Sequence, residues 1–385
     1  MQKPIPAGYW LCKMKTSIVL GLQYGDEGKG LITSSLSNSN DLVIRFNGGH
    51  QAGHTVTKEG YRHIFSNFGS GTLNGAHTFW SEYCTFYPPA FRREELSLKN
   101  ECHIKPIFFI HPLAMVTTPF DIDHNRKLEE VNQHGSVGVG FGATIARHTE
   151  TPYKLFAIDL ANENIMHHKL LQIAKYYGVE NPEKQIRDFE FKVDAIQIEM
   201  HIKTLPEIIN SYKHIIFEGS QGILLDMDFG YFPHVTRSNT TSKNAMQIIK
   251  ENGLPAPDVW YVMRSYATRH GNGPMPYESK EICFEDKTNM SHAYQGEFRQ
   301  GHHQTYNLSH ALKLDSIFSG NDYDKKNLAI TCLNQTENMI FMNGRPVTVR
   351  EFLDRLGRKF NKVVLSRSAD DEQFSLMKNK SKINY

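Results

Sequence analysis

A glycine-rich segment near the start of the chain carries charged side chains that suit phosphate chemistry. In the stretch IVLGLQYGDEGKGL (residues 18–31), the charged residues Asp26, Glu27 and Lys29 follow an apolar run. Glycines at such a turn let the backbone approach a ligand and expose N–H groups at a helix start, which favours an anion. The P-loop pattern does not fit, because Gln23 and Gly30 occupy two of its fixed positions. Acidic residues also begin many helices for dipole reasons alone, so a plain helix start is the alternative.

A second glycine-rich segment, NGGHQAGHT, follows the apolar run DLVIRF and holds His50 and His54. A single His is more often structural, but glycines that clear space around an imidazole suggest contact with a ligand. The spacing of the two histidines would suit a metal pair only on a helix, and the glycines of the segment disfavour a helix. We therefore expect a proton donor or a hydrogen bond to a phosphoryl oxygen here.

A third segment, FEGSQGILLDMDFGYFPHVTRSNTTS, follows another apolar run and is interrupted by glycine. Its polar candidates are Gln221, Asp226, Asp228, Thr236 and Asn239. The two carboxylates, two residues apart, could bind a metal, cap the following helix or hold the loop by local hydrogen bonds. Loops rich in Asp, Ser and Thr usually serve turns, which favours a structural role for both carboxylates.

Composition limits the partners that these segments can serve. Lys plus Arg (43) nearly balance Asp plus Glu (41), and no basic tract with interleaved aromatics is present, so polymeric nucleic acid is not an expected partner. The five cysteines are scattered without a C-x-x-C pair, which disfavours a disulfide framework and a structural zinc site. The N-terminal apolar run is too short for a membrane span and lacks a signal-peptide pattern. We expect a cytoplasmic protein with no membrane partner.

Short apolar, β-branched runs recur along the chain and are nearly continuous rather than alternating. They cover Ser17–Leu22, Asp41–Phe46, Phe108–Ile110, Ile215–Phe217, Val259–Tyr266, Leu328–Leu333 and Val363–Leu365. Such runs are typical of strands buried on both faces of a parallel sheet. Helical patterns lie between them, for example at Asn162–Tyr177, Ser242–Asn252 and Val347–Phe360. The sequence thus predicts an α/β fold with one central, mostly parallel sheet flanked by helices, and a ligand site at the carboxyl ends of its strands.

The chain contains no internal repeat, low-complexity tract or convincing linker. We expect an N-terminal extension over residues 1–13 and a single domain over residues 14–385. Within that domain, residues 76–210 are a candidate helical insertion.

The glycine-rich segments are far more specific together than separately. In their order along the chain, GLQYGDEGKG, NGGHQAGHT and EGSQGILLDMDFGYFPHVTRSNTT closely resemble the signatures of the adenylosuccinate synthetase family. SYATRHGNGP resembles that family's later Y-S-T-R-x-G-x-G-P segment. The resemblance implies a P-loop-related fold and a carbon–nitrogen ligase that joins L-aspartate to C6 of a purine nucleotide, using a nucleoside triphosphate and Mg²⁺. The 6-oxo group is first phosphorylated, and the aspartate amine then displaces phosphate.

The resemblance also implies roles for individual residues. Asp26 would remove the N1 proton and bind Mg²⁺ together with the carbonyl of Gly53, while His54 and Lys29 would serve the transferring phosphoryl group. Residues implied to bind the substrate nucleotide are Gln51, Ser136, Val137, Arg147, Gln221, Leu225 and Thr236. Residues implied to bind the donor nucleotide are Gly25, Glu27, Gly28, Lys29, Gly30, Asn334, Gln335, Ser366 and Ala369. Arg299 and Gln300 are the candidates for aspartate. Arg147, matched with a gap, would reach the site of the other subunit, which implies a homodimer.

Departures from the family pattern concern the aspartate and donor sites. The arginine-rich aspartate loop of the bacterial enzymes has shrunk to RQGHHQ. Standard members read the guanine of GTP with T-K-L-D and S-T-G-P-D-R, whose counterparts here are TCLN (residues 331–334) and SRSADD (residues 366–371). An Asn amide offers one acceptor and one donor, which matches adenine rather than guanine. We therefore expect ATP rather than GTP as donor.

A shortened chain with an altered guanine site resembles the phage branch of the family, whose members act in the host cytoplasm. Those enzymes couple aspartate to dGMP and give N6-succinyl-2-amino-2′-deoxyadenylate on the route to diaminopurine DNA. Retention of Asp26 counts against this branch, because some phage members have a smaller residue there. The alternatives are an ordinary enzyme acting on IMP with GTP and a nucleotide-binding regulator that has lost catalysis.

Overall fold

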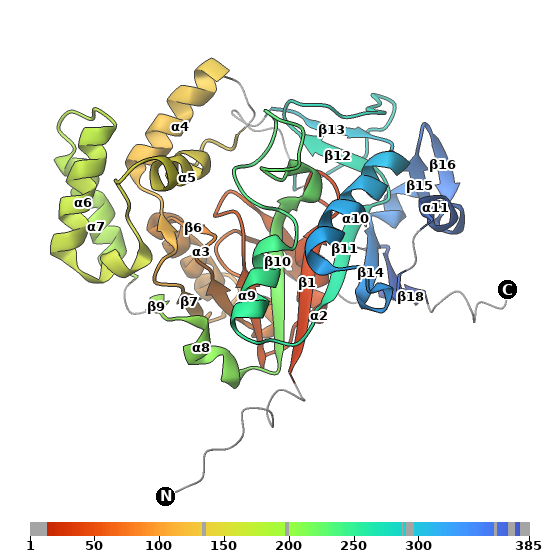
Figure 1. The fold of residues 1–385 in the computed structure, drawn as a ribbon, viewed down its shortest axis with the longest axis horizontal. Helices are drawn as coiled ribbons and strands as arrows, with labels where there is room; N and C mark the ends of the chain where they lie inside the picture. Colours follow the sequence, from red (N-terminus) through yellow and green to blue (C-terminus); the bar gives the residue numbers. More distant parts are fainter. Residues whose placement is uncertain are drawn as a thin grey trace, which may run out of the picture.

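A ten-stranded sheet forms the centre of the protein in a computed structural model that describes residues 14–132, 136–196, 200–286, 288–289, 296–357, 360–368 and 374–377. Figure 1 shows the sheet with helices on both sides. In spatial order its strands are β18 (Phe374–Met377), β17 (Lys362–Ser366), β14 (Lys326–Thr331), β11 (Asp258–Arg264), β1 (Lys15–Gly21), β10 (His214–Gly222), β2 (Asp41–Arg45), β5 (His77–Trp80), β7 (Phe108–Ile110) and β9 (Met200–Ile202). β17 and β18 pair antiparallel, and the other neighbouring pairs of this sheet are parallel.

Helices and small two-stranded sheets surround this sheet. The helices are α2 (Lys29–Leu36), α3 (Pro88–Asn100), α4 (Pro119–Asn132), α5 (Phe141–Glu150), α6 (Glu163–Tyr176), α7 (Glu183–Asp194), α8 (Leu205–Ile208), α9 (Lys243–Glu251), α10 (Thr305–Ser319) and α11 (Val349–Leu356). The smaller pairs are β3 (His54–Lys58) with β4 (Tyr61–Phe65), β6 (Thr85–Phe86) with β8 (Met115–Val116), β12 (Ala267–His270) with β13 (Phe298–Gly301), and β15 (Met339–Met342) with β16 (Arg345–Thr348). No helix in the described part of the chain is both long and apolar enough to cross a membrane.

Burial on both faces explains the continuous apolar runs. Successive residues of a strand point to opposite faces of a sheet. In β1, Ile18 and Leu20 join the core beneath α9 and α10, whereas Val19 packs on the other face with Ile32 of α2. All three are fully buried. Most positions of such a strand are therefore apolar, and the predicted α/β class with a mainly parallel sheet is confirmed.

The runs expected to be strands all belong to the sheet, as β1, β2, β7, β10, β11, β14 and β17. The three helices given as examples are also present, as α6, α9 and α11, with ends shifted by a few residues. β5, β9 and β18 were not predicted, because a polar residue interrupts the short apolar run in each of them.

The segment 76–210 contributes strands as well as helices. It extends one edge of the sheet with β5, β7 and β9 and carries α3 to α8. Figure 1 shows α4 to α7 gathered on that side of the molecule, away from α11 and β15–β16. The division of the chain into one domain with an insertion stays a prediction, and the extension over residues 1–13 lies outside the described residues.

A buried carboxylate holds the helices of this segment together. Asp121, at the start of α4, is fully buried and accepts hydrogen bonds from the backbone and hydroxyl of Thr118. It also accepts from Nε and Nη2 of Arg147 on α5, at 2.8 and 2.9 Å, and from the hydroxyl of Tyr177 at 2.9 Å. One side chain thus ties α4 and α5 to the end of α6.

Replacing Asp121 should destabilise the fold strongly. Asp121→Asn leaves the guanidinium of Arg147 buried without its counter-charge, and loss of one member of such a pair typically costs about 3–5 kcal/mol. Urea unfolding should show a loss of this size, with the exposed Asp188→Asn on α7 as the control. Equal stability of the two variants would contradict the proposed tie.

Candidate active site

A cavity of about 1050 Å³ opens at the carboxyl ends of the central strands. Its walls come from the segments that follow β1, β2, β10, β11 and β14, as expected for an open parallel sheet. The candidate residues that line it are Gly25, Asp26, Glu27, Gly28, Lys29, Gly30, Gln51, Gly53, His54, Ser136, Val137, Arg147, Gln221, Leu225, Thr236, Asn334 and Gln335. Ser366, Arg299 and Gln300 are not part of this lining, and Ala369 lies outside the described residues.

The glycine-rich turn after β1 has an unusual backbone. Gly25 and Gly28 have φ angles of 97° and 94°, and Asp26 between them has a φ of 61°. A left-handed conformation at a residue other than glycine costs on the order of 1 kcal/mol and is typical of functional sites. At Gly30, a Cβ atom would lie 2.8 Å from the Cβ of His54. The absence of a side chain at position 30 therefore lets the start of α2 pack directly against β3, which brings Lys29 and His54 together.

Glu27 points into the turn rather than into the cavity. Its Oε1 accepts from the backbone N–H groups of Gln23 and Gly25, at 3.1 and 2.8 Å. Its Oε2 accepts from Lys29 Nζ at 2.7 Å, and both side chains are buried. Glu27 thus shapes the turn and neutralises Lys29 in the absence of another anion.

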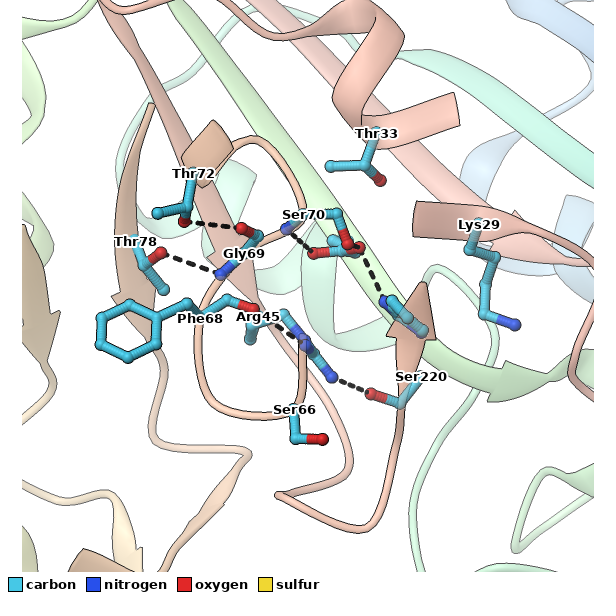
Figure 2. A network of polar contacts seen from close by, with 12 residues as sticks. Lys29, Thr33, Arg45, Ser66, Phe68, Gly69, Ser70, Thr72, Thr78 and Ser220 are labelled. Carbon is cyan, nitrogen blue, oxygen red and sulfur yellow. Dashed lines mark hydrogen bonds and ion pairs between the residues drawn. The ribbon is translucent and has the colours of Figure 1, made fainter. Parts of the chain in front are cut away.

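His54 is oriented by a carboxylate from the neighbouring strand. Its Nδ1 lies 2.7 Å from Oε1 of Glu218 on β10, a residue with no exposed surface. Glu218 also accepts from the hydroxyl and the backbone N–H of Ser70. Figure 2 shows Ser70 and Arg45 in one polar network, in which the Arg45 guanidinium donates to the Ser220 hydroxyl at 2.8 Å and to the Phe68 carbonyl.

The environment keeps this carboxylate ionised. Burial would raise the pKa of Glu218, but the charge and hydrogen bond of His54, followed by Arg45, lower that pKa to about 2. Burial lowers the pKa of His54, against the opposing effect of Glu218. At neutral pH Nδ1–H therefore donates to Glu218, and Nε2 is left for the cavity that His54 lines. A negative ligand near Nε2 would favour the imidazolium, which Glu218 stabilises.

Glu218 was missed as a functional residue, although it begins the quoted EGSQG segment. The available signal was an acidic residue directly after the apolar run IIF in a strand buried on both faces. Such a residue must be paired. Arg45 gave the same signal in DLVIRF, and it too is fully buried.

The pair Asp226 and Asp228 holds a loop, as favoured from the sequence. Asp226 is fully buried and accepts from the backbone N–H groups of Thr240 and Thr241, at 2.6 and 3.2 Å. Asp228 accepts from the Asn239 amide at 2.7 Å and from Lys243 at 3.1 Å. Across the described ranges, no group of three or more His, Cys, Asp and Glu side chains is arranged to hold a metal ion.

Arg147 makes its contacts within its own chain. In addition to Asp121, its guanidinium donates to the carbonyls of Tyr153 and Val116, at 2.7 and 2.8 Å. A buried guanidinium requires such partners, because unpaired N–H groups are costly away from water. The geometry favours a structural role for Arg147 within its protomer, so the contact across subunits and the homodimer stay predictions.

The aspartate candidates are engaged outside the cavity. Arg299 makes a two-pronged pair with Glu278 and donates to the carbonyls of Gly271 and Gly273, both at 2.9 Å. The Gln300 amide accepts from and donates to the backbone of Phe284. Both side chains stabilise the surroundings of the β12–β13 strand pair, and the structure does not bring them to the other candidate residues. RQGHHQ alone could not distinguish a free guanidinium from a committed one.

An open, mainly parallel sheet with a cavity of this kind at its carboxyl edge defines an α/β protein with a ligand site at the strand ends. The family model described as adenylosuccinate synthetase matches residues 18–303, so the chain belongs to the adenylosuccinate synthetase family of carbon–nitrogen ligases. Adenylosuccinate synthetase of Azobacteroides pseudotrichonymphae is 28% identical over 304 residues, which cover 73% of this chain and 70% of the relative. That of Helicobacter pylori strain P12 is 32% identical over 272 residues, which cover 68% of this chain and 66% of the relative. These matches thus span about two thirds of the relatives' length.

Two solved structures share the fold. A fully ligated adenylosuccinate synthetase from Plasmodium falciparum superposes with a TM-score of 0.74 at 18% identity, covering 94% of this chain and 99% of its own. Succinoaminodeoxyadenylate synthetase of cyanophage S-2L, bound to dGMP and dATP, superposes with a TM-score of 0.66 at 17% identity. The superposed region covers 94% of this chain and 95% of the cyanophage chain. The similarity to both extends over nearly the whole chain.

The depressed pKa of Glu218 predicts a pH-dependent contribution to stability. Its pKa falls from an ordinary 4.5 to about 2 on folding, so the stabilisation is fully present above pH 4.5 and is lost as the pH falls towards 2. Such a shift corresponds to on the order of 3 kcal/mol. Urea unfolding at a series of pH values should show wild-type stability falling more steeply below about pH 5 than that of Glu218→Gln. Parallel curves for the two proteins would show that Glu218 is not ionised by its surroundings.

Proposed function

We propose that the protein joins L-aspartate to C6 of dGMP with ATP as phosphate donor, giving 2-amino-2′-deoxy-N6-succinyladenylate, ADP and phosphate. The observation that carries the ligase chemistry is the meeting of Asp26, Lys29 and His54 in one cavity at the carboxyl edge of the sheet. The fold shared with the cyanophage enzyme bound to dGMP and dATP supports the choice of nucleotides.

In the proposed reaction, Asp26 accepts the N1 proton of the purine, which makes the 6-oxygen a nucleophile. About a quarter (26%) of the Asp26 side chain is exposed, so its carboxylate is available to a ligand. Lys29 exchanges Glu27 for a phosphate oxygen, and His54, oriented by Glu218, stabilises the charge on the transferring phosphoryl group. The neutral aspartate amine then attacks C6, the C6–O bond breaks as phosphate leaves with its bonding electrons, and the amine nitrogen loses a proton to solvent.

The donor set in the cavity fits Mg²⁺. Mg²⁺ is usually held by one or two carboxylates together with substrate phosphates and water, rather than by a protein cage. The carboxylate of Asp26 and the carbonyl of Gly53 would hold it, and both residues line the cavity. When bound, the ion neutralises phosphate charge and orients the phosphoryl group for in-line transfer.

The proposed preference for ATP rests on the segment after β14. Asn334 is exposed at the cavity wall, where its amide can offer adenine one acceptor and one donor. The neighbouring Gln335 is already engaged, since its amide accepts from the Tyr266 hydroxyl and donates to the Glu285 carbonyl, both at 2.8 Å. Asn334 is therefore the residue of this segment with which we expect the base to interact.

An ordinary adenylosuccinate synthetase acting on IMP with GTP is the second candidate. It is favoured by the names of the relatives cited above and by the retention of Asp26. A regulator without catalysis is a remote third, because it would have no use for Asp26, Lys29 and His54 in one cavity.

A crossed assay tests the proposal. The protein is incubated with aspartate and Mg²⁺, and IMP, GMP and dGMP are each combined with ATP and GTP while phosphate release is measured. We expect turnover with dGMP, and a kcat/KM at least about tenfold higher with ATP than with GTP. Asn334→Asp should reduce this preference, because a carboxylate accepts from both N1–H and N2–H of guanine. Exclusive use of IMP with GTP would establish the second candidate, and no phosphate release from any pair would favour the regulator.

Two substitutions test the catalytic assignments. Asp26→Asn should abolish turnover, since an amide cannot accept the N1 proton and carries no charge for Mg²⁺. His54→Asn should lower kcat by about a hundredfold or more, on the scale of one lost transition-state hydrogen bond. Steady-state kinetics provide the measurement, with thermal unfolding as the control for intact folding. Near-wild-type kcat in a folded variant would remove the role of that residue.

A further inference from the structure

The turn that carries Asp26 is supported from two sides. Within the turn, the Glu27 carboxylate accepts from the backbone N–H of Gly25, and from β14 the Thr331 hydroxyl donates to the Glu27 carbonyl at 2.7 Å. From β11, Nε of Arg264 donates to the carbonyl oxygen of Asp26 itself at 2.5 Å. Arg264 therefore reaches the residue that has the left-handed backbone and carries the proposed base.

The other N–H groups of Arg264 also donate hydrogen bonds to fixed acceptors. Nη1 donates to the Tyr266 hydroxyl at 2.9 Å, and Nη2 donates to the Asp286 carboxylate at 2.7 Å. The guanidinium carbon lies 5.4 Å from the ring centroid of Phe298, which covers one face. The Arg264 side chain is 9% exposed. Only a planar guanidinium can hold these three acceptors at once, because an ammonium lacks the rigid fork.

Asp286 is itself fixed by its local turn. It accepts from the backbone N–H groups of Thr288 and Asn289, both at 2.8 Å. Burial would raise the pKa of Asp286, but Arg264 and the hydrogen bonds from Asn289 lower it to about 2, so the carboxylate is ionised at neutral pH. The position of Arg264 is thus set by an ion pair and not by Asp26 alone.

A closed set of contacts extends this support to the donor side of the cavity. The carbonyl of Glu285, next to Asp286, accepts from the Gln335 amide, and Gln335 accepts from the same Tyr266 hydroxyl that Arg264 contacts. Gln335 is adjacent to Asn334 on the wall proposed to bind the base of the triphosphate. The Asp26 turn and this wall are therefore held by the same residues, Arg264 and Tyr266.

We propose that Arg264, held by Asp286, is a positioning residue that keeps the Asp26 carboxylate where it accepts the N1 proton. The inference rests on the proposed function and adds two residues to it. Arg264 acts through the backbone of Asp26, so its loss should affect the chemical step more than nucleotide binding.

Arg264→Lys and Asp286→Asn test this role. The first replaces the planar guanidinium with an ammonium, and the second removes the carboxylate charge that pairs with Arg264. In each, kcat should fall at least about tenfold, on the scale of a misplaced catalytic group. The KM values for both nucleotides should stay within about threefold of wild type. Arg345→Lys, in an exposed ion pair with Glu351 far along the chain, is the matched control and should leave kcat unchanged.

Chemical rescue separates positioning from general stability. In Arg264→Ala, added ethylguanidinium should restore part of kcat, because it can reoccupy the space between Asp26 and Asp286. Equal concentrations of ethylammonium should not restore it, since an ammonium cannot bridge both acceptors.

Wild-type kcat in a folded Arg264→Lys or Asp286→Asn variant overturns the inference. The inference is also overturned if the variants change KM but not kcat, if Arg345→Lys loses as much kcat as they do, or if ethylguanidinium and ethylammonium rescue Arg264→Ala equally. A wild-type protein that turns over no nucleotide pair removes the proposed function together with this inference. An active wild type with unaffected variants removes this inference alone.

Discussion

The buried carboxylate of Glu218 constrains much of the surrounding architecture. It lies on a central strand with no exposed surface, where an ionised group is tolerated only with close partners. Those partners, His54 and Ser70, come from segments that follow β2, so the β3–β4 hairpin and the loop after it must fold back over the end of the sheet. The demand for charge compensation thus places an imidazole at the edge of the cavity.

Other charges near the cavity follow the same logic. Lys29 is paired with Glu27, Arg264 with Asp286 and Arg147 with Asp121. Each of these three cations has a carboxylate partner within the chain, so the cavity wall is not a bare concentration of positive charge. An anion that binds Lys29 must compete with the Glu27 carboxylate, which favours ligands that carry several negative charges over a singly charged anion.

Seven of the ten strands of the sheet were predictable because burial on two faces leaves continuous apolar runs. The glycine-rich turns were predictable for a related reason, since Gly25 and Gly28 have backbone angles that other residues rarely adopt. What could not be predicted was the commitment of individual arginines. The partner of Arg147 lies 26 residues away and that of Arg299 lies 21 residues away, and neither is marked by a local pattern. The partner of His54 is 164 residues distant, so only the folded chain reveals it.

The hydrogen bonds that hold the Arg147 guanidinium limit which residues of the cavity can change during evolution. Arg147 lines one wall of the cavity, and its pair with Asp121 holds three helices together. A substitution of either residue would therefore affect the fold as well as ligand binding. Val137 and Leu225 line the same cavity with side chains that hold no hydrogen bond. Adaptation to a new purine would therefore proceed most readily through such apolar positions, whereas the charged wall changes only when its partners change with it.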